Sequence, residues 1–535
     1  MVQVELYDTT LRDGAQFEGI SLSVEDKLAI TAKLDQLGVH YIEGGWPGSN
    51  PTDAEFFERA KSLKLKNATL AAFGSTRRAD INAKDDGNLL ALLEAETPVV
   101  TLVGKTWDLH VTRVLETSLE ENLAMISDSV DFLRTQGRRV FFDAEHFFDG
   151  YKANPGYAIQ AVKAAANTGA ECVILCDTNG GVLPHEIADI MRKVKSETDV
   201  ALGIHTHNDA DLAVGGAIVA VQNGAVQIQG TINGYGERCG NANLLSVIAN
   251  LKLKMGIDCV TDEQLATLTE VSHYVAEVAN MPPVGSQPYV GASAFAHKGG
   301  LHAAAVAKVE HSYQHVPPQN LGNEKRVLIS ELSGRGNILW KVEELGLDID
   351  LSKSQARELL EHIKLQESKG FQYEGAEASF ELLVRRLMPG YVAPFTLVDF
   401  VSMVEKREGN GHPADISSQV MLKVRVADEV MHTAADGNGP VNSLDNALRK
   451  ALLQFYPNLE TVRLVDYKVR VVDQSSSTGA IVRVLIESTD GRKTWNTVGS
   501  SENVIEASWM ALSDSMEYWL VRERSASGAH VAAAS

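Results

Sequence analysis

The chain contains few cysteines, no run of basic residues and no long apolar segment. Four of its 535 residues are cysteine, at positions 172, 176, 239 and 259, and none belongs to a C-x-x-C pair. So low a count is typical of a reducing compartment, where structural disulfides are rare. The 70 acidic and 49 basic residues give a net charge of -21, which argues against nucleic acid or an anionic membrane as a partner.

No apolar run is long enough to span a bilayer, and no basic segment precedes an apolar one near residue 1. We therefore expect a cytoplasmic protein with neither a signal peptide nor a membrane span. Hydrophobic residues make up 44% of the chain and charged residues 22%, which suits packed cores. The length predicts about three or four domain-sized units, of which a large barrel can account for two.

Short apolar runs alternate with amphipathic segments of helical length between residues 2 and 253. Eight runs have the composition of buried strands: 4–7, 41–44, 69–73, 99–103, 140–143, 172–177, 201–206 and 226–231. Helical crossovers between parallel strands cover the sheet, so the pattern predicts an α/β fold, a (β/α)8 TIM barrel. An open doubly wound sheet is the alternative, and the lack of G-x-G-x-x-G after the first strand argues against it.

In such a barrel, functional side chains come from the C-terminal ends of the strands. Arg12 and Asp13 follow the first strand, and Glu43 ends the second. Because side chains alternate along a strand, His205 and His207 of the seventh strand face the same way and can bind one divalent ion. An isolated His-x-His pair is more often structural. The polar residues at the other strand ends favour a site.

These residues predict a metal centre with two imidazoles and the Asp13 carboxylate as ligands, and with the Asn241 amide oxygen as a further candidate. Nitrogen and oxygen ligands without thiolate suit Mg2+, Mn2+ or Zn2+. An ion so bound would chelate a 2-oxo acid and polarise its carbonyl. Arg12 would stabilise the oxyanion that develops there, and Glu43 would hold the Arg12 guanidinium from behind.

Three motifs resemble the family of 2-isopropylmalate synthase, homocitrate synthase and citramalate synthase. They are DTTLRDG at 8–14, HTHND at 205–209 and GERCGN at 236–241. The resemblance extends over almost the whole chain, and the segments EGGWPGSNP at 43–51 and KTWDLH at 105–110 are most similar to the citramalate synthase branch. It implies an acyltransferase in which the methyl carbon of acetyl-CoA attacks a 2-oxo acid, pyruvate in that branch. Thioester hydrolysis then releases CoA and leaves citramalate.

The resemblance also implies roles for single residues. Asp13, His205, His207 and Asn241 would bind the metal, and Arg12 would contact the carbonyl of the keto acid. Glu145 and Thr178 match positions that contact substrate, and Glu145 would also act on a proton. Asp143 matches a position that shapes the keto-acid pocket.

A segment after the barrel departs from the family pattern. Family members carry His-Gln-Asp-Gly there and extend it into the neighbouring subunit's active site, whereas residues 297–305 read HKGGLHAAA. His302 is kept, but Ala304 replaces the usual acid. We expect His302 to act as general base or acid. Tyr313 matches the family's later tyrosine.

We expect four parts: a catalytic barrel at 1–270, covering helical subdomains at 271–390, a regulatory domain at 391–524 and a disordered tail at 525–535. In the third part, two groups of alternating strand residues each precede a helix, a weak internal repeat. By resemblance this domain makes a homodimer and binds a branched-chain amino acid. Isoleucine is the effector expected for the citramalate branch, which serves isoleucine biosynthesis.

Three alternatives stay open. A 2-isopropylmalate synthase acting on 2-oxoisovalerate is the nearest, because a few extra carbons shift binding by only about 1–3 kcal/mol. A metal-dependent lyase on the same barrel is disfavoured by the regulatory domain, and an amino-acid-sensing scaffold without activity is disfavoured by the intact metal ligands. Arg77 and Arg78 are candidate contacts for the CoA phosphates, although exposed arginine pairs are usually solvated.

Overall fold

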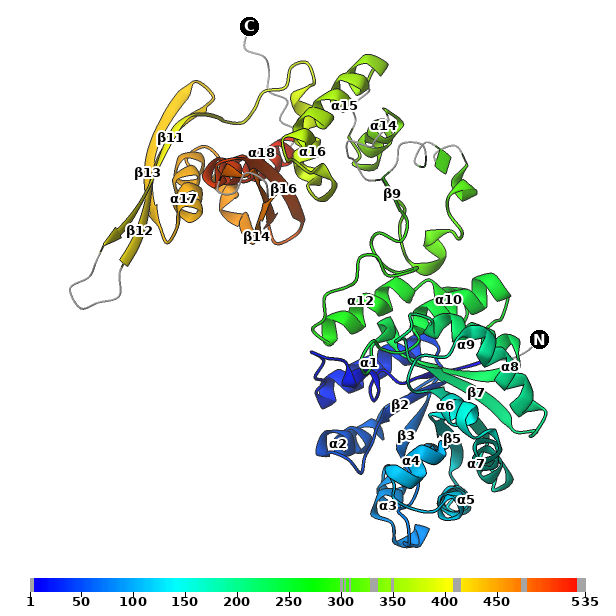
Figure 1. Ribbon diagram of the computed structural model, residues 1–535. Helices are drawn as coiled ribbons and strands as arrows, with labels where there is room; N and C mark the ends of the chain where they lie inside the picture. The colour runs from blue at the N-terminus through cyan, green and yellow to red at the C-terminus, as the bar shows by residue number, and fades with distance from the viewer. Residues whose placement is uncertain are drawn as a thin grey trace. The chain divides into compact units, whose positions relative to one another are not determined.

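The computed structural model describes residues 4–298, 302, 305–306, 309–327, 335–347, 351–407, 415–472 and 479–526. The chain divides into two compact units, residues 1–295 with 314–325 and residues 296–313 with 326–535, and each is described by itself (Figure 1). Among the described residues, no helix combines the length and apolar character that crossing a bilayer requires. The tail expected to be disordered lies, from residue 527 onward, outside the described residues.

The first unit is a closed barrel of eight parallel strands, which confirms the predicted TIM barrel and excludes the open sheet. In order around the barrel they are β1 (Glu5–Asp8), β2 (Tyr41–Gly45), β3 (Thr69–Ser75), β4 (Val99–Lys105), β5 (Arg139–Glu145), β6 (Cys172–Asp177), β7 (Ala201–Thr206) and β8 (Ala225–Gly230). Strand β1 pairs with both β2 and β8, so the barrel sheet is continuous.

Helices cover the outside of the barrel. They are α1 (Val24–Leu37), α2 (Pro51–Ala60), α3 (Gly87–Glu94), α4 (Asp108–Arg113), α5 (Leu119–Thr135), α6 (Phe147–Ala153), α7 (Pro155–Asn167), α8 (Pro184–Lys195), α9 (Ala213–Gln222), α10 (Leu244–Met255), α11 (Asp262–Leu265) and α12 (Leu268–Val278). Ser23 and Asp26 form the capping box that starts α1, and Pro184 stands in the first turn of α8. The sequence indicates one helix over 262–279, but the structure divides it into α11 and α12.

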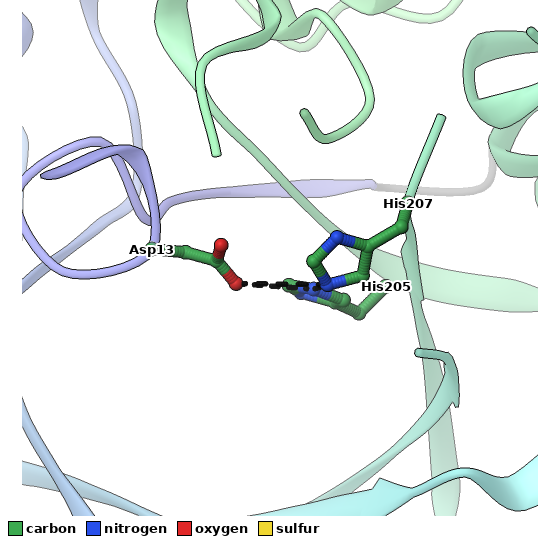
Figure 2. A group of neighbouring side chains, drawn as sticks. All are labelled: Asp13, His205 and His207. Carbon is green, nitrogen blue, oxygen red and sulfur yellow. Dashed lines mark hydrogen bonds and ion pairs between the residues drawn. The ribbon is translucent and has the colours of Figure 1, made fainter. Parts of the chain in front are cut away.

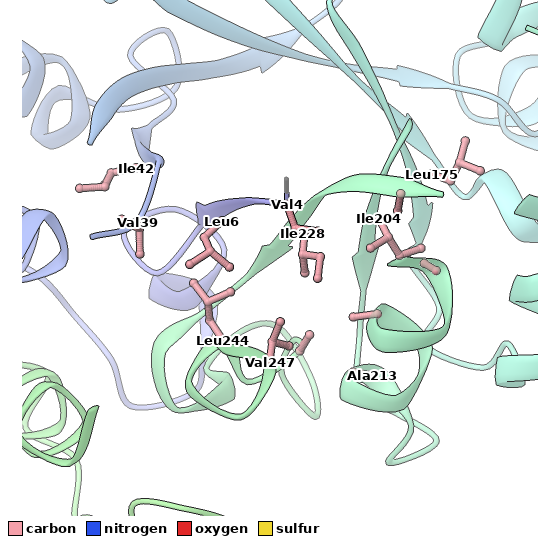
Figure 3. Close-up of a cluster of buried hydrophobic side chains, with 14 of the residues drawn as sticks. Val4, Leu6, Val39, Ile42, Leu175, Ile204, Ala213, Ile228, Leu244 and Val247 are labelled. Atoms are coloured by element: carbon pink, nitrogen blue, oxygen red, sulfur yellow. The ribbon is translucent and has the colours of Figure 1, made fainter. Parts of the chain in front are cut away.

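The barrel has two buried layers because successive side chains of a strand point to opposite faces. The outer layer, between strands and helices, is apolar and includes Leu6, Ile204, Ile228 and Leu244 (Figure 3). Inside the barrel, aromatic residues such as Tyr7, Tyr41 and Phe141 fill the cross-section. Buried polar residues at the strand ends lie above this aromatic layer and form the floor of the candidate site.

The second unit combines a small helical part with two copies of a three-stranded antiparallel sheet and a helix. Its elements are β9 (Ala296–His297), β10 (Arg326–Val327), α14 (Arg335–Glu344), α15 (Lys353–Ser368), α16 (Glu377–Arg386), β11 (Thr396–Arg407), β12 (Asp415–Val426), β13 (Glu429–Gly437), α17 (Pro440–Leu452), β14 (Arg463–Val471), β15 (Val482–Thr489), β16 (Thr494–Ser501) and α18 (Val504–Ala526). The order of β11 to α18 confirms the predicted repeat of strands followed by a helix.

A buried ion pair holds α1, α2 and the turn after β2 together. The Lys27 ammonium pairs with the Asp53 carboxylate and donates to the Gly44 carbonyl at 3.1 Å, and Asp53 also accepts from the Trp46 backbone N–H at 2.8 Å. The side chains of Lys27 and Asp53 are only 5% and 10% exposed. This cluster fixes Trp46 at the C-terminal end of the barrel.

The Asp53→Ala variant should lower the free energy of unfolding of the barrel by about 3–5 kcal/mol, because it leaves the Lys27 charge buried without a partner. Urea unfolding followed by tryptophan fluorescence measures the change. Glu58→Ala, on the same helix, removes an exposed ion pair with Lys61 and should cost less than about 1 kcal/mol. Equal losses in the two variants would contradict the buried-pair explanation.

Candidate active site and metal centre

Three side chains, from the segment after β1 and from the end of β7, converge at the C-terminal end of the barrel. Asp13 Oδ2 lies 3.5 Å from His205 Nε2 and 3.8 Å from His207 Nε2, and the two Nε2 atoms are 3.3 Å apart. Figure 2 shows the carboxylate and both rings pointing toward one another. All three residues are buried, and they are the group among the described residues that can hold a metal ion.

A glutamine that the sequence analysis did not single out orients His205. Gln229, on β8, places Oε1 2.8 Å from His205 Nδ1, and its Nε2 donates to Asp143 Oδ1 at 2.9 Å. With Gln229 Oε1 as the acceptor, His205 carries its proton on Nδ1 and keeps the Nε2 lone pair free for a metal. Gln229 is a polar residue within an otherwise buried strand, and this feature of the sequence could have identified it as a candidate site residue.

Electrostatics keep the three ligands in their metal-binding protonation states. Burial lowers the pKa of His205, and burial together with His205 lowers the pKa of His207 to about 3. Burial alone would raise the pKa of Asp13, but Arg12 and the two histidines outweigh it and lower that pKa to about 2. Near neutral pH the site therefore offers one carboxylate and two neutral imidazoles.

Buried polar atoms without partners fit a divalent cation at this position. Asp13 Oδ1 and Asn241 Oδ1 are buried and accept no hydrogen bond from any described residue. Asn241 stands beside the histidines because its backbone forms a β-bridge with that of His207. Unsatisfied oxygens beside two imidazoles suit Mg2+, Mn2+ or Zn2+, and the donor set does not choose among these ions.

Arg12 lies next to the triad and is held on several sides. Its Nε donates to Glu43 Oε1 at 2.5 Å, its Nη1 lies 3.2 Å from Asp13 Oδ2, and its guanidinium carbon is 4.0 Å from the centroid of the Phe73 ring. Glu43 is fully buried and also accepts from the Tyr7 hydroxyl at 2.7 Å. The guanidinium is thus oriented beside the predicted metal position.

Two adjoining cavities open around these residues. The first has a volume of about 230 Å³ and is lined by the triad together with Arg12, Gln16, Phe73, Asp143, Cys176, Thr178 and Glu237. The second has a volume of about 400 Å³ and is lined by Arg77, Arg78 and Lys105 among others. Trp46, Val103 and Glu145 line both cavities, so these three residues mark the junction.

The remaining predicted substrate contacts of the barrel line the first cavity. Thr178 Oγ1 accepts from the His146 backbone N–H at 2.9 Å. Asp143 is buried, and burial followed by the nearby Glu43 raises its pKa well above the usual value. The Glu145 carboxylate pairs with the Lys105 ammonium. Lys105 was part of a motif in the sequence, but nothing there indicated this contact.

The triad belongs to the first unit, whereas His302 and Tyr313 belong to the second. Their rings stack with centroids 4.4 Å apart, and both side chains are exposed. Ala304 lies outside the described residues.

The structure divides the arginine pair that follows β3. The Arg77 side chain is 6% exposed and pairs with Glu121 and Asp128 of α5 at 2.7 Å each, so its guanidinium already has two carboxylate partners. Arg78 is exposed, and no described residue pairs with its guanidinium. Its guanidinium is free for a ligand.

Comparisons with known proteins agree with this architecture. The HMGL-like family matches residues 3–275, the homocitrate synthase post-HMGL domain-like family matches 289–370, and the LeuA allosteric (dimerisation) domain matches 374–520.

Curated relatives match over nearly their full length. The chain is 53% identical to an (R)-citramalate synthase of Geobacter sulfurreducens over 99% of both chains. It is 52% identical to an (R)-citramalate synthase of Aquifex aeolicus, over 97% of this chain and 98% of the relative. A 2-isopropylmalate synthase of Methanocaldococcus jannaschii is 29% identical over 97% of this chain and 95% of the relative. The chain therefore belongs to the family of acyltransferases that includes citramalate synthase, 2-isopropylmalate synthase and homocitrate synthase.

Proposed function

We propose that the chain condenses acetyl-CoA with pyruvate to give citramalate and CoA. Support comes from two relatives, 53% and 52% identical to the chain, that are named (R)-citramalate synthase. The observation that carries the proposal is the convergence of Asp13, His205 and His207 beside Arg12 in a cavity of about 230 Å³. The choice of pyruvate over a branched keto acid rests on these two relatives, since the 2-isopropylmalate synthase of Methanocaldococcus jannaschii is only 29% identical to the chain.

A divalent ion held by Asp13, His205 and His207 would chelate the keto acid and polarise its carbonyl. The Arg12 guanidinium donates a hydrogen bond to the oxygen of that carbonyl as it gains negative charge. Glu43, which already accepts from Arg12 Nε, prevents the guanidinium from turning away. Thr178 and Asp143 border the keto acid in the same cavity.

The acetyl-CoA thioester enters through the second cavity, which meets the first at Glu145. Arg78 lines this second cavity, and its guanidinium, which has no partner among the described residues, binds a phosphate of CoA. The Glu145 carboxylate stands where the acetyl methyl must pass, and it takes a proton from that methyl group. The resulting enolate carbon attacks the keto carbon, and hydrolysis of the thioester then releases CoA.

The second unit supplies regulation and the remaining catalytic groups. Each of its sheets buries one face under a helix, and in the first sheet the opposite face exposes Val401 and Met403 on β11 and Met421 on β12. We propose that this face makes a homodimer, in which His302 and Tyr313 serve the active site of the neighbouring subunit. Isoleucine is the proposed inhibitor, and the proposed division is 1–270, 271–390, 391–524 and 525–535.

The substrate is tested by assaying CoA release with pyruvate and with 2-oxoisovalerate as acceptors. The kcat/KM with pyruvate should exceed that with 2-oxoisovalerate by at least about 10-fold, because the two additional methyl groups of 2-oxoisovalerate would contact the residues that line the cavity. Faster turnover of 2-oxoisovalerate would replace the proposal with a 2-isopropylmalate synthase. Cleavage of citramalate without net synthesis would favour a lyase.

His205→Ala should abolish tight binding of Mn2+ and reduce kcat by at least about 100-fold, because the ion loses a ligand that also orients the others. Metal content after gel filtration, measured by mass spectrometry, provides a readout independent of activity. His273→Ala removes an exposed histidine of α12 and serves as the control. If the His205→Ala protein retained the ion content and Mn2+ activation of the wild type, His205 would not be a ligand.

Arg78→Ala should raise the KM for acetyl-CoA by roughly 10-fold and leave the KM for pyruvate within about twofold, because only the phosphate contact is lost. Initial rates with each substrate varied in turn separate the two effects. Arg113→Ala, at the end of α4, removes another barrel arginine outside the cavity residues and provides a matched control. An unchanged KM for acetyl-CoA would exclude Arg78 from the phosphate site.

A further inference from the structure

Lys105 and Glu145 occupy matching positions at the ends of neighbouring strands. Lys105 is the last residue of β4, Glu145 is the last residue of β5, and the two are direct partners in the strand register. Both side chains are 23% exposed, and the ammonium and carboxylate form an ion pair. The register therefore presents the two charges to each other before any substrate binds.

The Glu145 carboxylate has a single partner among the side chains that the structure describes. Only the Lys105 ammonium hydrogen-bonds to its oxygens among the described residues, although Arg12 and Asp143 line the same cavity as Glu145. The backbone around the pair is anchored independently. The Lys105 carbonyl accepts from Asn122 Nδ2 at 2.8 Å, and the Glu145 carbonyl accepts from Thr106 Oγ1 at 2.8 Å.

The pair lies at the junction of the two cavities. Lys105 lines only the second cavity, whereas Glu145 lines both. From its position on β4, the ammonium therefore determines where the carboxylate stands at the opening between them. A carboxylate without this partner would be free to change rotamer in a site that is more than three-quarters buried.

We propose that Lys105 is a positioning residue that holds the Glu145 carboxylate at the opening between the cavities, aimed at the methyl group of the thioester. Glu145 accepts a proton from that methyl carbon, and the C–H electron pair forms the enolate of the thioester. The enolate carbon then bonds to the keto carbon, whose carbonyl electron pair moves to oxygen. Lys105 keeps its proton throughout. This inference rests on the proposed function, since it assigns Glu145 to that reaction.

The test is a double-mutant cycle in the full-length protein with Lys105→Met and Glu145→Gln, assayed with radiolabelled acetyl-CoA and pyruvate. Lys105→Met should lower kcat by at least about 10-fold, with the KM for pyruvate within about twofold, because the base is displaced from its target. In the Glu145→Gln background the same substitution should change kcat by less than about twofold, since Lys105 acts through Glu145.

Two further measurements distinguish positioning from a structural role. With trideuterated acetyl-CoA, the isotope effect on kcat/KM should rise in Lys105→Met, because proton removal becomes slower relative to the other steps. Lys105→Arg should restore kcat to within about threefold of wild type by keeping the cation. Lys163→Met removes an exposed ion pair with Glu197 and serves as the control. Thermal unfolding identifies misfolded variants, and Lys105→Gln replaces Lys105→Met if that variant does not fold.

Each outcome decides between the hypotheses. Equal fold losses for Lys105→Met in the wild-type and Glu145→Gln backgrounds would overturn the inference, as would an unchanged kcat in Lys105→Met. Both results require an active wild-type enzyme and leave the proposed function intact. A wild-type protein that releases no CoA with any 2-oxo acid would overturn the proposed function, and the role of Lys105 with it.

Discussion

The pairing of β1 with β8 is the contact on which the candidate site depends. Asp13 follows β1, whereas His205 and His207 belong to the end of β7, almost 200 residues later in the chain. In an open sheet with the same strand order, six steps of about 4.8 Å would separate these strands by roughly 30 Å. Closure brings Asp13 Oδ2 within 3.8 Å of both imidazoles. A metal centre drawn from the first and seventh strands therefore exists only because the barrel is closed.

The net charge of the buried groups around Asp13, His205 and His207 explains why this site favours a cation. Asp13 and Glu43 are buried carboxylates, and Arg12 is the cation that contacts both. The histidines are neutral near pH 7, because burial lowers the pKa of each. The local sum is one negative charge in a buried site, and a buried charge without compensation is costly. A divalent ion reverses that imbalance and also occupies the unsatisfied oxygens of Asp13 and Asn241.

Features that depend on local sequence patterns, such as strand positions, could be predicted from the sequence. Features that depend on contacts between distant parts of the chain could not. Buried parallel strands are continuous apolar runs, so all eight were located to within one or two residues. Strand alternation brought His205 and His207 together for the same reason. By contrast, Arg77 is sequestered by Glu121 and Asp128, which lie more than 40 residues away in sequence. At the break between α11 and α12, the backbone of Gly322, more than 50 residues later in the sequence, lies close to the Ala266 carbonyl.

The residues that the sequence analysis missed act on residues that it identified. Gln229 sets the tautomer of His205, and Lys105 contacts Glu145. Each pair is formed across strands: His205 and Gln229 are register partners of β7 and β8, as Lys105 and Glu145 are of β4 and β5. Register depends on the pairing of whole strands and leaves no trace at a single position. Reactive groups at strand ends can therefore be read from alternation alone, whereas the residues that orient them follow only once the strands are aligned in the closed barrel.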